Sequence, residues 1–417
     1  MRSGGAASGI VALIAALATV ASTVAPTGGI VTATHPSRFV SGWIPNWSTG
    51  VVTDGLRVFN AGQGYENMFA ETSPFGFSAT SATTIATSGA ESTLTTAVQT
   101  LRNRGIQVVP SITDGTGKLT MAAILADPAT RTEHVTAIVA LVMSRSYDGI
   151  DLDYEGFAFS DGRASWPTTR PVWAAFVNEL ATALHAQGKL LSVTVPPIWA
   201  SGAQGYTVYA WPEIIASVDR LRLMVYDWSV SRPGPISPMV WVDDVISYVQ
   251  GVAGPMIGKV QIGVPTYGRS WATVISGTCP VNADLTTRAV QMENAGALAA
   301  GKGATATRDV SGEMKFTYDE SFTGTRTAAL PAPEYVIPVV RANTLAPADG
   351  SALAAALRLS PVTGTVTCTV RRTVYYPDSD SVVQRARAAI DAGTAGIAIW
   401  ALGYETADLW PKLAAIS

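Results

Sequence analysis

Short apolar runs recur along the chain, and stretches whose apolar residues lie three or four positions apart separate them. Runs of this length are typical of buried strands, whereas the three-and-four spacing is typical of amphipathic helices. The runs predict eight strands, at residues 39–44, 71–77, 106–112, 149–154, 190–195, 220–226, 260–265 and 396–400. The spacing predicts helices at residues 91–104, 128–145, 171–187, 238–252 and 381–392.

A strand followed by a helix, repeated about eight times, indicates parallel β/α units. We therefore expect an α/β protein built as a closed (β/α)8 TIM barrel. An open doubly wound sheet is the alternative. Such sheets usually carry a glycine-rich phosphate turn after a strand, and the sequence contains none.

One long segment interrupts this rhythm. Residues 269–374 are rich in Thr and Gly and contain β-favouring pieces, with some helical pattern. We expect them to form a small, mostly β inserted subdomain of α+β type between strands seven and eight, over the barrel face where the strands end. The catalytic barrel would then comprise residues 38–268 and 375–417.

The N-terminus has the pattern of a secretory leader. Arg2 is followed by an apolar run at residues 9–20 and then by small residues. A membrane anchor is the alternative, but the run is shorter than the ~20 residues that a span needs. We expect residues 1–33 to be a signal peptide and flexible mature terminus, and the protein to be secreted, with the cell wall as an alternative location.

Composition narrows the function. Charged residues make up 14% of the chain and the formal net charge is −3, which excludes a disordered charged chain and a basic nucleic-acid binder. The two cysteines, Cys279 and Cys368, form a plausible disulfide in an oxidising compartment. Closing a loop of this length would stabilise the fold by about 4–5 kcal/mol in the chain-entropy model. Two buried free thiols are the alternative.

Residues 148–155, which read Asp-Gly-Ile-Asp-Leu-Asp-Tyr-Glu, are the most informative stretch. Because side chains alternate across a strand, Asp151, Asp153 and Glu155 share one face, with neighbours ~6.6 Å apart. In a barrel, this face points inward, toward the active-site end. Crowded carboxylates do not all ionise together, so we expect at least one to keep its proton near neutral pH. A neutral carboxyl is what a general acid requires.

Other chemistries fit the residues less well. Clustered carboxylates also bind hard cations, but a strand spreads them along a line and lacks the glycine turn of a calcium loop. A purely structural acid network is a further alternative. The three histidines (His35, His134 and His185) lie away from any nucleophile motif and are expected to be surface or packing residues. We expect no metal and no other cofactor.

The spacing Asp148-x-x-Asp151-x-Asp153-x-Glu155 resembles the signature of glycoside hydrolase family 18, the chitinase-like (β/α)8 barrels. Further segments resemble this family in the same order, at residues 224–227, 263–269 and 396–405, so the resemblance covers about residues 38–414. Residues 228–242 are closer to its bacterial spore-cortex and peptidoglycan-associated branch. One departure is on strand three, where residues 111–115 read Ser-Ile-Thr-Asp-Gly in place of the S-x-G-G of many members.

The resemblance implies a role for each matching residue. Glu155 would be the general acid, while the acetamido oxygen of the substrate attacks the anomeric carbon, a substrate-assisted route with overall retention. Asp153 would orient the acetamido group, Asp151 would share a proton with Asp153, and Tyr226 would hydrogen-bond the acetamido oxygen. The other expected substrate contacts are Asp227, Trp400, Met224, Tyr267, Arg269 and Trp43, although Met224 taken alone fits core packing better. Asp148 would brace the start of the strand.

The function implied is a secreted glycoside hydrolase that cleaves β-linked N-acetylglucosamine-containing glycans, either chitin-type oligomers or peptidoglycan. The alternative is a non-catalytic, lectin-like carbohydrate-binding protein on the same barrel. The expected partner is a polysaccharide or oligosaccharide with N-acetylglucosamine. We expect no nucleic-acid partner and no stable membrane anchor, and the chain is expected to be a monomer.

Overall fold

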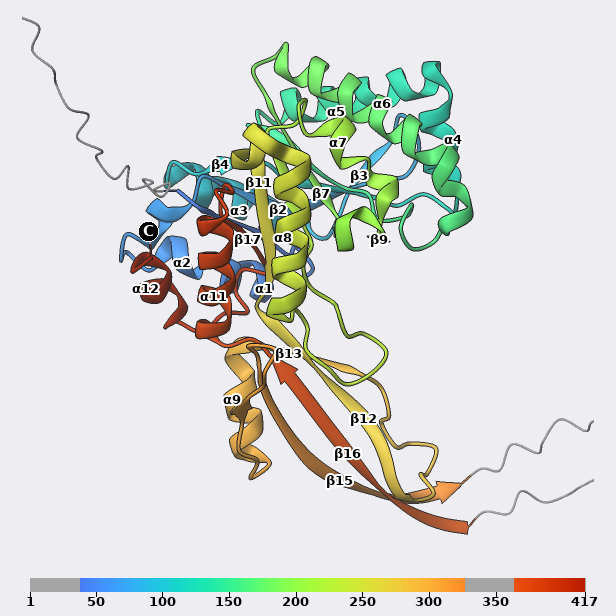
Figure 1. Ribbon diagram of the computed structural model, residues 1–417, viewed down its shortest axis with the longest axis vertical. Coiled ribbons are helices and arrows are strands. Elements are labelled where there is room, and N and C mark those ends of the chain that lie inside the picture. The colour runs from blue at the N-terminus through green and yellow to red at the C-terminus, as the bar shows by residue number, and fades with distance from the viewer. Residues whose placement is uncertain (1–37, 327–363, 417) are drawn as a thin grey trace, which may run out of the picture. The chain divides into compact units, whose positions relative to one another are not determined.

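A computed structural model describes residues 38–326 and 364–416 (Figure 1). Eight parallel strands form its barrel: β1 (Val40–Ile44), β2 (Glu71–Ala79), β5 (Ser111–Asp114), β6 (Gly149–Asp153), β7 (Leu190–Val195), β10 (Arg220–Leu223), β11 (Val260–Pro265) and β17 (Ile397–Trp400). The pairing order is β1-β17-β11-β10-β7-β6-β5-β2, and β2 pairs again with β1, so the barrel is closed. The predicted TIM barrel is confirmed. The predicted leader at residues 1–33 lies outside the described residues.

Two strand boundaries differ from the sequence prediction for physical reasons. The predicted strand at 106–112 is divided into β4 (Gln107–Val108) and β5, because Pro110 has no N–H to donate to a ladder. The predicted strand at 220–226 loses its ladder after Leu223, three residues before the chain turns at Asp227, whose φ is 60°. Short pairings that the pattern did not predict are β3 (Ile85–Thr87), β8 (Ile198–Trp199) and β9 (Gln204–Gly205).

The five predicted helices are present as α3 (Glu91–Asn103), α5 (Pro128–Ser144), α6 (Trp166–His185), α8 (Met239–Ala253) and α11 (Ser379–Asp391). Asp127 caps α5 by accepting the N–H of Ala129. The predicted start of α6 at Pro171 is wrong: the helix begins at Trp166, and Pro167 occupies the first turn, where its missing N–H costs nothing.

Shorter helices fill the loops. They are α1 (Thr49–Gly55), α2 (Arg57–Asn60), α4 (Thr120–Ala126), α7 (Trp211–Ile214), α9 (Met292–Gly301) and α12 (Leu409–Ala414), with 3-10 turns at Tyr65–Met68, Arg163–Ser165, Ala200–Gly202, Thr207–Tyr209 and Gly254–Lys259. Among the described residues, no helix combines the length and apolar character needed to cross a membrane.

Between β11 and β17 the chain forms a second, antiparallel sheet, in the order β13-β12-β16-β15-β14. Its strands are β12 (Tyr267–Gly277), β13 (Arg288–Gln291), β14 (Thr307–Arg308), β15 (Met314–Arg326) and β16 (Gly364–Tyr376), and α9 packs against it (Figure 1). A disulfide joins Cys279, two residues past β12, to Cys368 in β16, as predicted. β12 starts two residues after β11 ends, so this sheet is attached directly to the mouth of the barrel.

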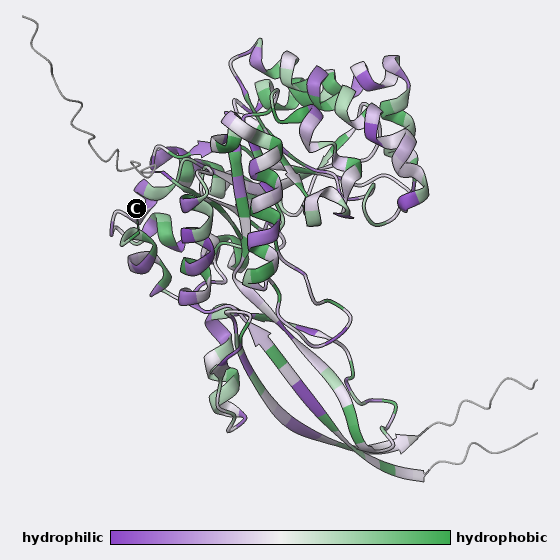
Figure 2. Cartoon of the chain, in the orientation of Figure 1, coloured by the Kyte–Doolittle hydropathy of each residue, from purple (hydrophilic) through white to green (hydrophobic). Residues whose placement is uncertain are grey.

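The apolar core lies between the barrel strands and the surrounding helices. On β6, Ile150 and Leu152 point outward into this core and are fully buried. Figure 2 shows apolar residues along the barrel strands, while hydrophilic residues follow the outer faces of the helices. The barrel lumen, in contrast, contains polar side chains that are almost fully buried: Ser41, Glu71, Ser73, Ser111, Asp151, Ser192, Thr194, Arg222 and Gln261.

Candidate active site

The row of acids lies on β6 and directly after it, at the end of the barrel where the parallel strands end. Asp151 and Asp153 belong to the strand and Glu155 follows it. The intervening Leu152 and Tyr154 are completely buried on the opposite face. The alternation predicted for this stretch therefore points all three carboxyl groups into the lumen.

Asp151 is the most deeply buried of the three acids, with no exposed surface. Trp43 Nε1 donates to it at 2.9 Å, and the Arg222 guanidinium approaches within 3.5 Å. Hydroxyl groups surround its two oxygens at 2.6–3.1 Å, from Ser111, Ser192 and Thr194. Indole and guanidinium groups can only donate, so this environment suits an ionised carboxylate. A proton shared by the two aspartates would therefore reside on Asp153.

Asp153 and Glu155 lie in surroundings that favour their neutral forms. Burial, followed by the charges of Glu155 and Asp151, raises the pKa of Asp153 well above its usual value. Burial, followed by the charge of Asp227, raises the pKa of Glu155 to about 7. Glu155 can therefore carry a transferable proton at mildly acidic to neutral pH. Asp153 Oδ1 is buried and has no hydrogen-bond partner among the described residues.

Tyr226 follows β10 and lies against β11. A Cβ atom on Gly263 would come within 3.1 Å of the Tyr226 ring and 2.4 Å of the Leu223 carbonyl oxygen. Glycine at 263 is therefore needed for the ring to lie where it does. Burial raises the pKa of Tyr226 well above its usual value, so its hydroxyl group stays a hydrogen-bond donor. Met224 is 9% exposed and lines a hollow together with Tyr226.

Asp227 has a left-handed backbone conformation, with φ of 60°. Its Oδ1 accepts hydrogen bonds from the hydroxyl group of Tyr267 at 2.5 Å and from Nη2 of Arg269 at 2.7 Å. Both partners belong to β12, at the start of the inserted sheet. Tyr267 and Arg269, which the sequence predicts as substrate contacts, thus also hold Asp227 in place, beside Glu155.

Trp400 ends β17, and its peptide bond to Ala401 is cis. Its ring makes edge contacts with Trp43, Trp47 and Phe75, at centroid distances of 5.2–6.2 Å. Trp43 is 1% exposed and its indole N–H is bound to Asp151, so its main contact is with the acid row. Trp47 is 57% exposed and offers a free aromatic face.

Three adjoining hollows run over these residues and share parts of their walls. The central hollow, of about 290 Å³, contains Asp153, Glu155, Tyr226 and Trp400. The aromatic hollow, of about 540 Å³, shares Glu155 and Tyr226 with it and is lined further by Phe159, Pro196, Pro197, Trp199, Tyr206, Trp228, Val230 and Trp241. The insertion-side hollow, of about 580 Å³, shares Trp400 and Trp47 with the central one and is lined further by Arg269, Ala289, Val290, Gln291, Asn294, Leu298 and Tyr404.

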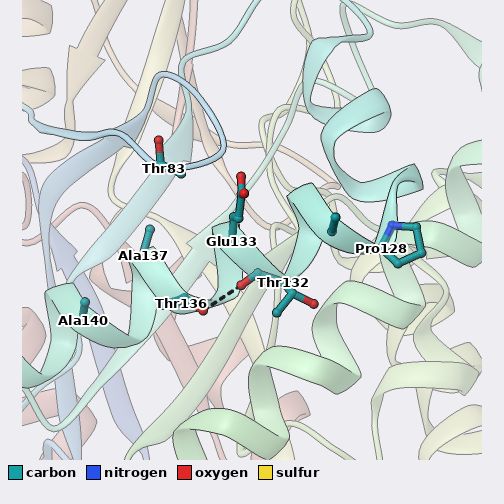
Figure 3. A pocket seen from close by; sticks show the side chains of 8 residues that line it. Thr83, Pro128, Thr132, Glu133, Thr136, Ala137 and Ala140 are labelled. Atoms are coloured by element: carbon teal, nitrogen blue, oxygen red, sulfur yellow. Dashed lines mark hydrogen bonds between the residues drawn. The ribbon is translucent and has the colours of Figure 1, made fainter.

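A separate groove of about 700 Å³ lies outside the barrel, over α5. Figure 3 shows its wall of small and polar side chains, including Ala137, Thr136 and Thr132, with Thr83 across from the helix. Glu133 is its one acidic residue, and no aromatic ring lines it. The groove lacks the chemistry of the central hollow and is not a candidate active site.

The remaining predicted residues lie as follows. Asp148 accepts the N–H of Val108 at 2.8 Å and so joins the start of β6 to β4, away from the hollows. Within the described part of the chain, no group of three or more His, Cys, Asp or Glu residues could hold a metal ion. His134 is buried and bridges the carbonyl group of Ala82 and the hydroxyl group of Tyr154.

Sequence reasoning missed several residues of the site. Thr194 lies on the inward face of β7, and the alternation used for β6 could have found it. Phe75, Tyr206 and Trp241 come from the middle of β2, a loop and a helix, and no pattern in the sequence connects them to the acids. Arg222 was also missed, although β10 reads Arg-Leu-Arg-Leu, and this alternation places Arg220 and Arg222 on the face opposite the leucines.

A closed barrel whose fourth strand ends in a row of acids is typical of glycosidases. Residues 64–405 match the family Glycosyl hydrolases family 18, and the chain belongs to this family.

Relatives and solved structures are consistent with this membership. YdhD of Bacillus subtilis, named as a sporulation-specific glycosylase, is 29% identical over 181 residues (42% of this chain and 41% of YdhD), and mouse Chitotriosidase-1 is 28% identical over 197 (42% and 40%). The chain thus matches about two fifths of the length of these curated relatives. A Chromobacterium violaceum chitinase shares its fold (TM-score 0.66, 19% identity, 90% of this chain and 98% of that one). The Bacillus cereus spore cortex-lytic enzyme SleL also shares the fold, with a TM-score of 0.63 and 18% identity over 91% of this chain and 74% of that one.

The pKa of Glu155 predicts the pH profile. We expect kcat/KM to fall as pH rises through about 7, because Glu155 then loses the proton it must donate. Asp227→Asn removes the neighbouring negative charge that helps to raise this pKa, so the decline should begin at lower pH. Asn tolerates the left-handed backbone and can still accept from Tyr267 and Arg269. Initial rates from pH 4 to 9 measure the effect. The matched control is Asp219→Asn, a residue that precedes β10 at the other end of the barrel. If kcat/KM of Asp227→Asn falls at the same pH as that of the wild type, Asp227 does not raise the pKa of Glu155.

The same pKa predicts how stability depends on pH. A carboxyl group whose folded pKa is raised from 4.5 to about 7 binds more protons folded than unfolded, so its contribution to stability is lost as pH rises between these values. Glu155→Gln abolishes this loss, and the variant should gain roughly 3 kcal/mol over the wild type between pH 4.5 and 8. Urea unfolding at both pH values gives the difference. The exposed Glu133→Gln should show no such gain; an equal gain there would refute the interpretation.

Proposed function

We propose that this glycosidase hydrolyses internal β-linkages of N-acetylglucosamine-containing glycans with retention of anomeric configuration, on chitin-type oligomers or peptidoglycan strands. The observation that carries the proposal is that Glu155, whose pKa burial and the charge of Asp227 raise to about 7, lies in one hollow with Oδ1 of Asp153, the Tyr226 hydroxyl group and the Trp400 ring. An acid, an acceptor, a donor and an aromatic floor are the parts that a substrate-assisted reaction requires.

Each group has a step that suits its chemistry. Glu155 gives its proton to the glycosidic oxygen as the bond to the anomeric carbon breaks. The substrate's acetamido oxygen forms a new bond to that carbon, and Asp153 Oδ1 accepts the acetamido N–H as positive charge develops on this group. Tyr226 donates to the acetamido oxygen and orients it. Water then attacks the anomeric carbon as the bond from that carbon to the acetamido oxygen breaks. One proton of the water passes to Glu155, the acetamido group is restored, and the product keeps the original configuration.

The positions of the hollows indicate where the sugars bind. Glu155 lines the central and aromatic hollows but not the insertion-side one, so the cleaved bond lies between the first two. The sugar that is attacked would occupy the central hollow over Trp400, and the departing sugar would stack in the aromatic hollow. Since the insertion-side hollow extends the cleft beyond Trp400, sugars have room on both sides of the bond, which favours cleavage within a chain.

The test offers chitohexaose, its fully deacetylated counterpart and purified peptidoglycan side by side, with products identified by mass spectrometry. We expect internal cleavage of at least one acetylated substrate and none of the deacetylated hexamer, which lacks the attacking group. Glu155→Gln should lower turnover about 10³-fold, within the usual range for loss of a general acid, whereas Glu133→Gln should not. Comparable rates on both hexamers would refute the substrate-assisted step. Binding without cleavage by the wild type would favour the lectin-like alternative.

We also propose that the protein acts outside the cytoplasm, where the Cys279–Cys368 disulfide persists. Expressed from its own N-terminus in a secreting bacterial host, it should appear in the medium without its leader and with both cysteines resistant to alkylation. The intact mass shows whether the leader has been removed, and the mass after alkylation shows whether the two cysteines have reacted. Retention inside the cells with alkylated Cys279 and Cys368 would refute this location.

A further inference from the structure

An ion pair crosses the inside of the barrel below the acid row. Arg222 on β10 has no exposed surface, and Glu71 on β2 is 1% exposed; Arg222 Nη2 lies 3.3 Å from Glu71 Oε1. β2 and β10 are four places apart in the cycle of eight strands, so the pair spans the barrel from one side to the other. Proteins rarely bury an arginine in this way unless its partners are also buried.

The Arg222 guanidinium contacts two anions at once. Nη1 lies 3.5 Å from Asp151 Oδ1 and donates to Ser73 Oγ at 2.6 Å, while Nε donates to Gln261 Oε1 at 3.0 Å. One cation is therefore shared between Glu71 below and Asp151 above. Removing it would leave Asp151 buried without a cation beside it, and would leave Glu71 with Arg220 alone, 2.9 Å away.

Asp151 is in turn one of the charges that act on Asp153. Arg222 therefore determines how much of the negative charge of Asp151 is felt by the acids nearer the substrate. The other charged and titratable groups around the row are Glu71 and Arg220 below it, Tyr226, Asp227, Tyr267 and Arg269 above it, and Tyr206, Tyr209 and Asp114 around Glu155 and Gly156. Among the cations of the described residues, Arg222 is the one whose guanidinium lies within 4 Å of a member of the acid row.

We propose that Arg222 is a positioning residue of the reaction: it holds Asp151 as an anion beneath Asp153 and thereby sets the pH range over which Glu155 can act. It touches no substrate and works through Asp151. The inference rests on the proposed function for its activity readout. It adds a charged element to the site that the acid signature does not contain.

Three variants separate charge from structure. Arg222→Met removes the cation, so the acids hold their protons more tightly. Both the acidic and the alkaline limbs of the kcat/KM profile should then shift to higher pH, by at least about 0.5 pH unit. Glu71→Gln removes the competing anion and strengthens the interaction of Arg222 with Asp151, so both limbs should shift to lower pH. The double variant removes one charge of each sign, and its limbs should return toward those of the wild type.

The control is Arg372→Met. Arg372 is also fully buried, but in the inserted sheet, where it binds Glu320 and backbone carbonyl groups. Its loss should lower the melting temperature and leave the limbs in place. If Arg222→Met lowers kcat/KM equally at every pH, as a purely structural role requires, the inference is overturned. Should Arg222→Met fail to fold, the opposite shift in Glu71→Gln decides, and its absence overturns the inference.

Different results would refute the proposed function and the role of Arg222. A wild type that cleaves nothing in the substrate panel refutes the proposed function. The same pH shifts are then read without substrate, from urea unfolding of the wild type, Arg222→Met and Glu71→Gln between pH 4 and 9. A wild type that is active while both variants keep its pH limbs refutes the role of Arg222 alone.

Discussion

A buried anion at the centre of the barrel, Asp151, must be compensated by groups inside the lumen, because water does not reach it. The fold meets this constraint with donors from several strands: an indole from β1, hydroxyl groups from β5 and β7, and a guanidinium from β10. None of these strands could shift its register by one residue without turning its donor away. The acid row and the closure of the barrel are therefore mutually dependent.

This arrangement also places three neighbouring acids, on β6 and directly after it, in contrasting surroundings. The deepest acid is surrounded by donors, whereas Asp153 is buried with one oxygen unpartnered and Glu155 lies in the hollow beside Asp227. Pairs of carboxyl groups in contrasting surroundings are a general way to obtain one charged and one neutral acid at the same pH. Here the contrast develops along a single strand, from the closed interior to the open cleft.

The sequence allowed much of this to be predicted, but unevenly. The barrel strands could be predicted because apolar runs and helical spacing are local signals, and the acid row because alternation on one strand is local too. The ion pair between Glu71 and Arg222 could not, because its partners are 151 positions apart and meet only when the barrel closes. The aromatic hollow could be predicted only in part for a similar reason. Trp199 and Trp228 fall near predicted strand ends, but the rings that join them come from a loop after β6, the segment after β9 and α8. The helix start at Pro171 was misjudged because proline is tolerated both at a helix start and, in this case, further along the same helix.

The inserted sheet cannot be regarded as an independent module. Its first strand carries Tyr267 and Arg269, whose hydrogen bonds hold Asp227 beside Glu155, and the same strand then continues for another eight residues to Gly277. A chain trimmed to the barrel alone would therefore lose both donors to Asp227. Changes in the length or edge pairing of this sheet can thus alter the charge beside Glu155 while the eight barrel strands stay as they are.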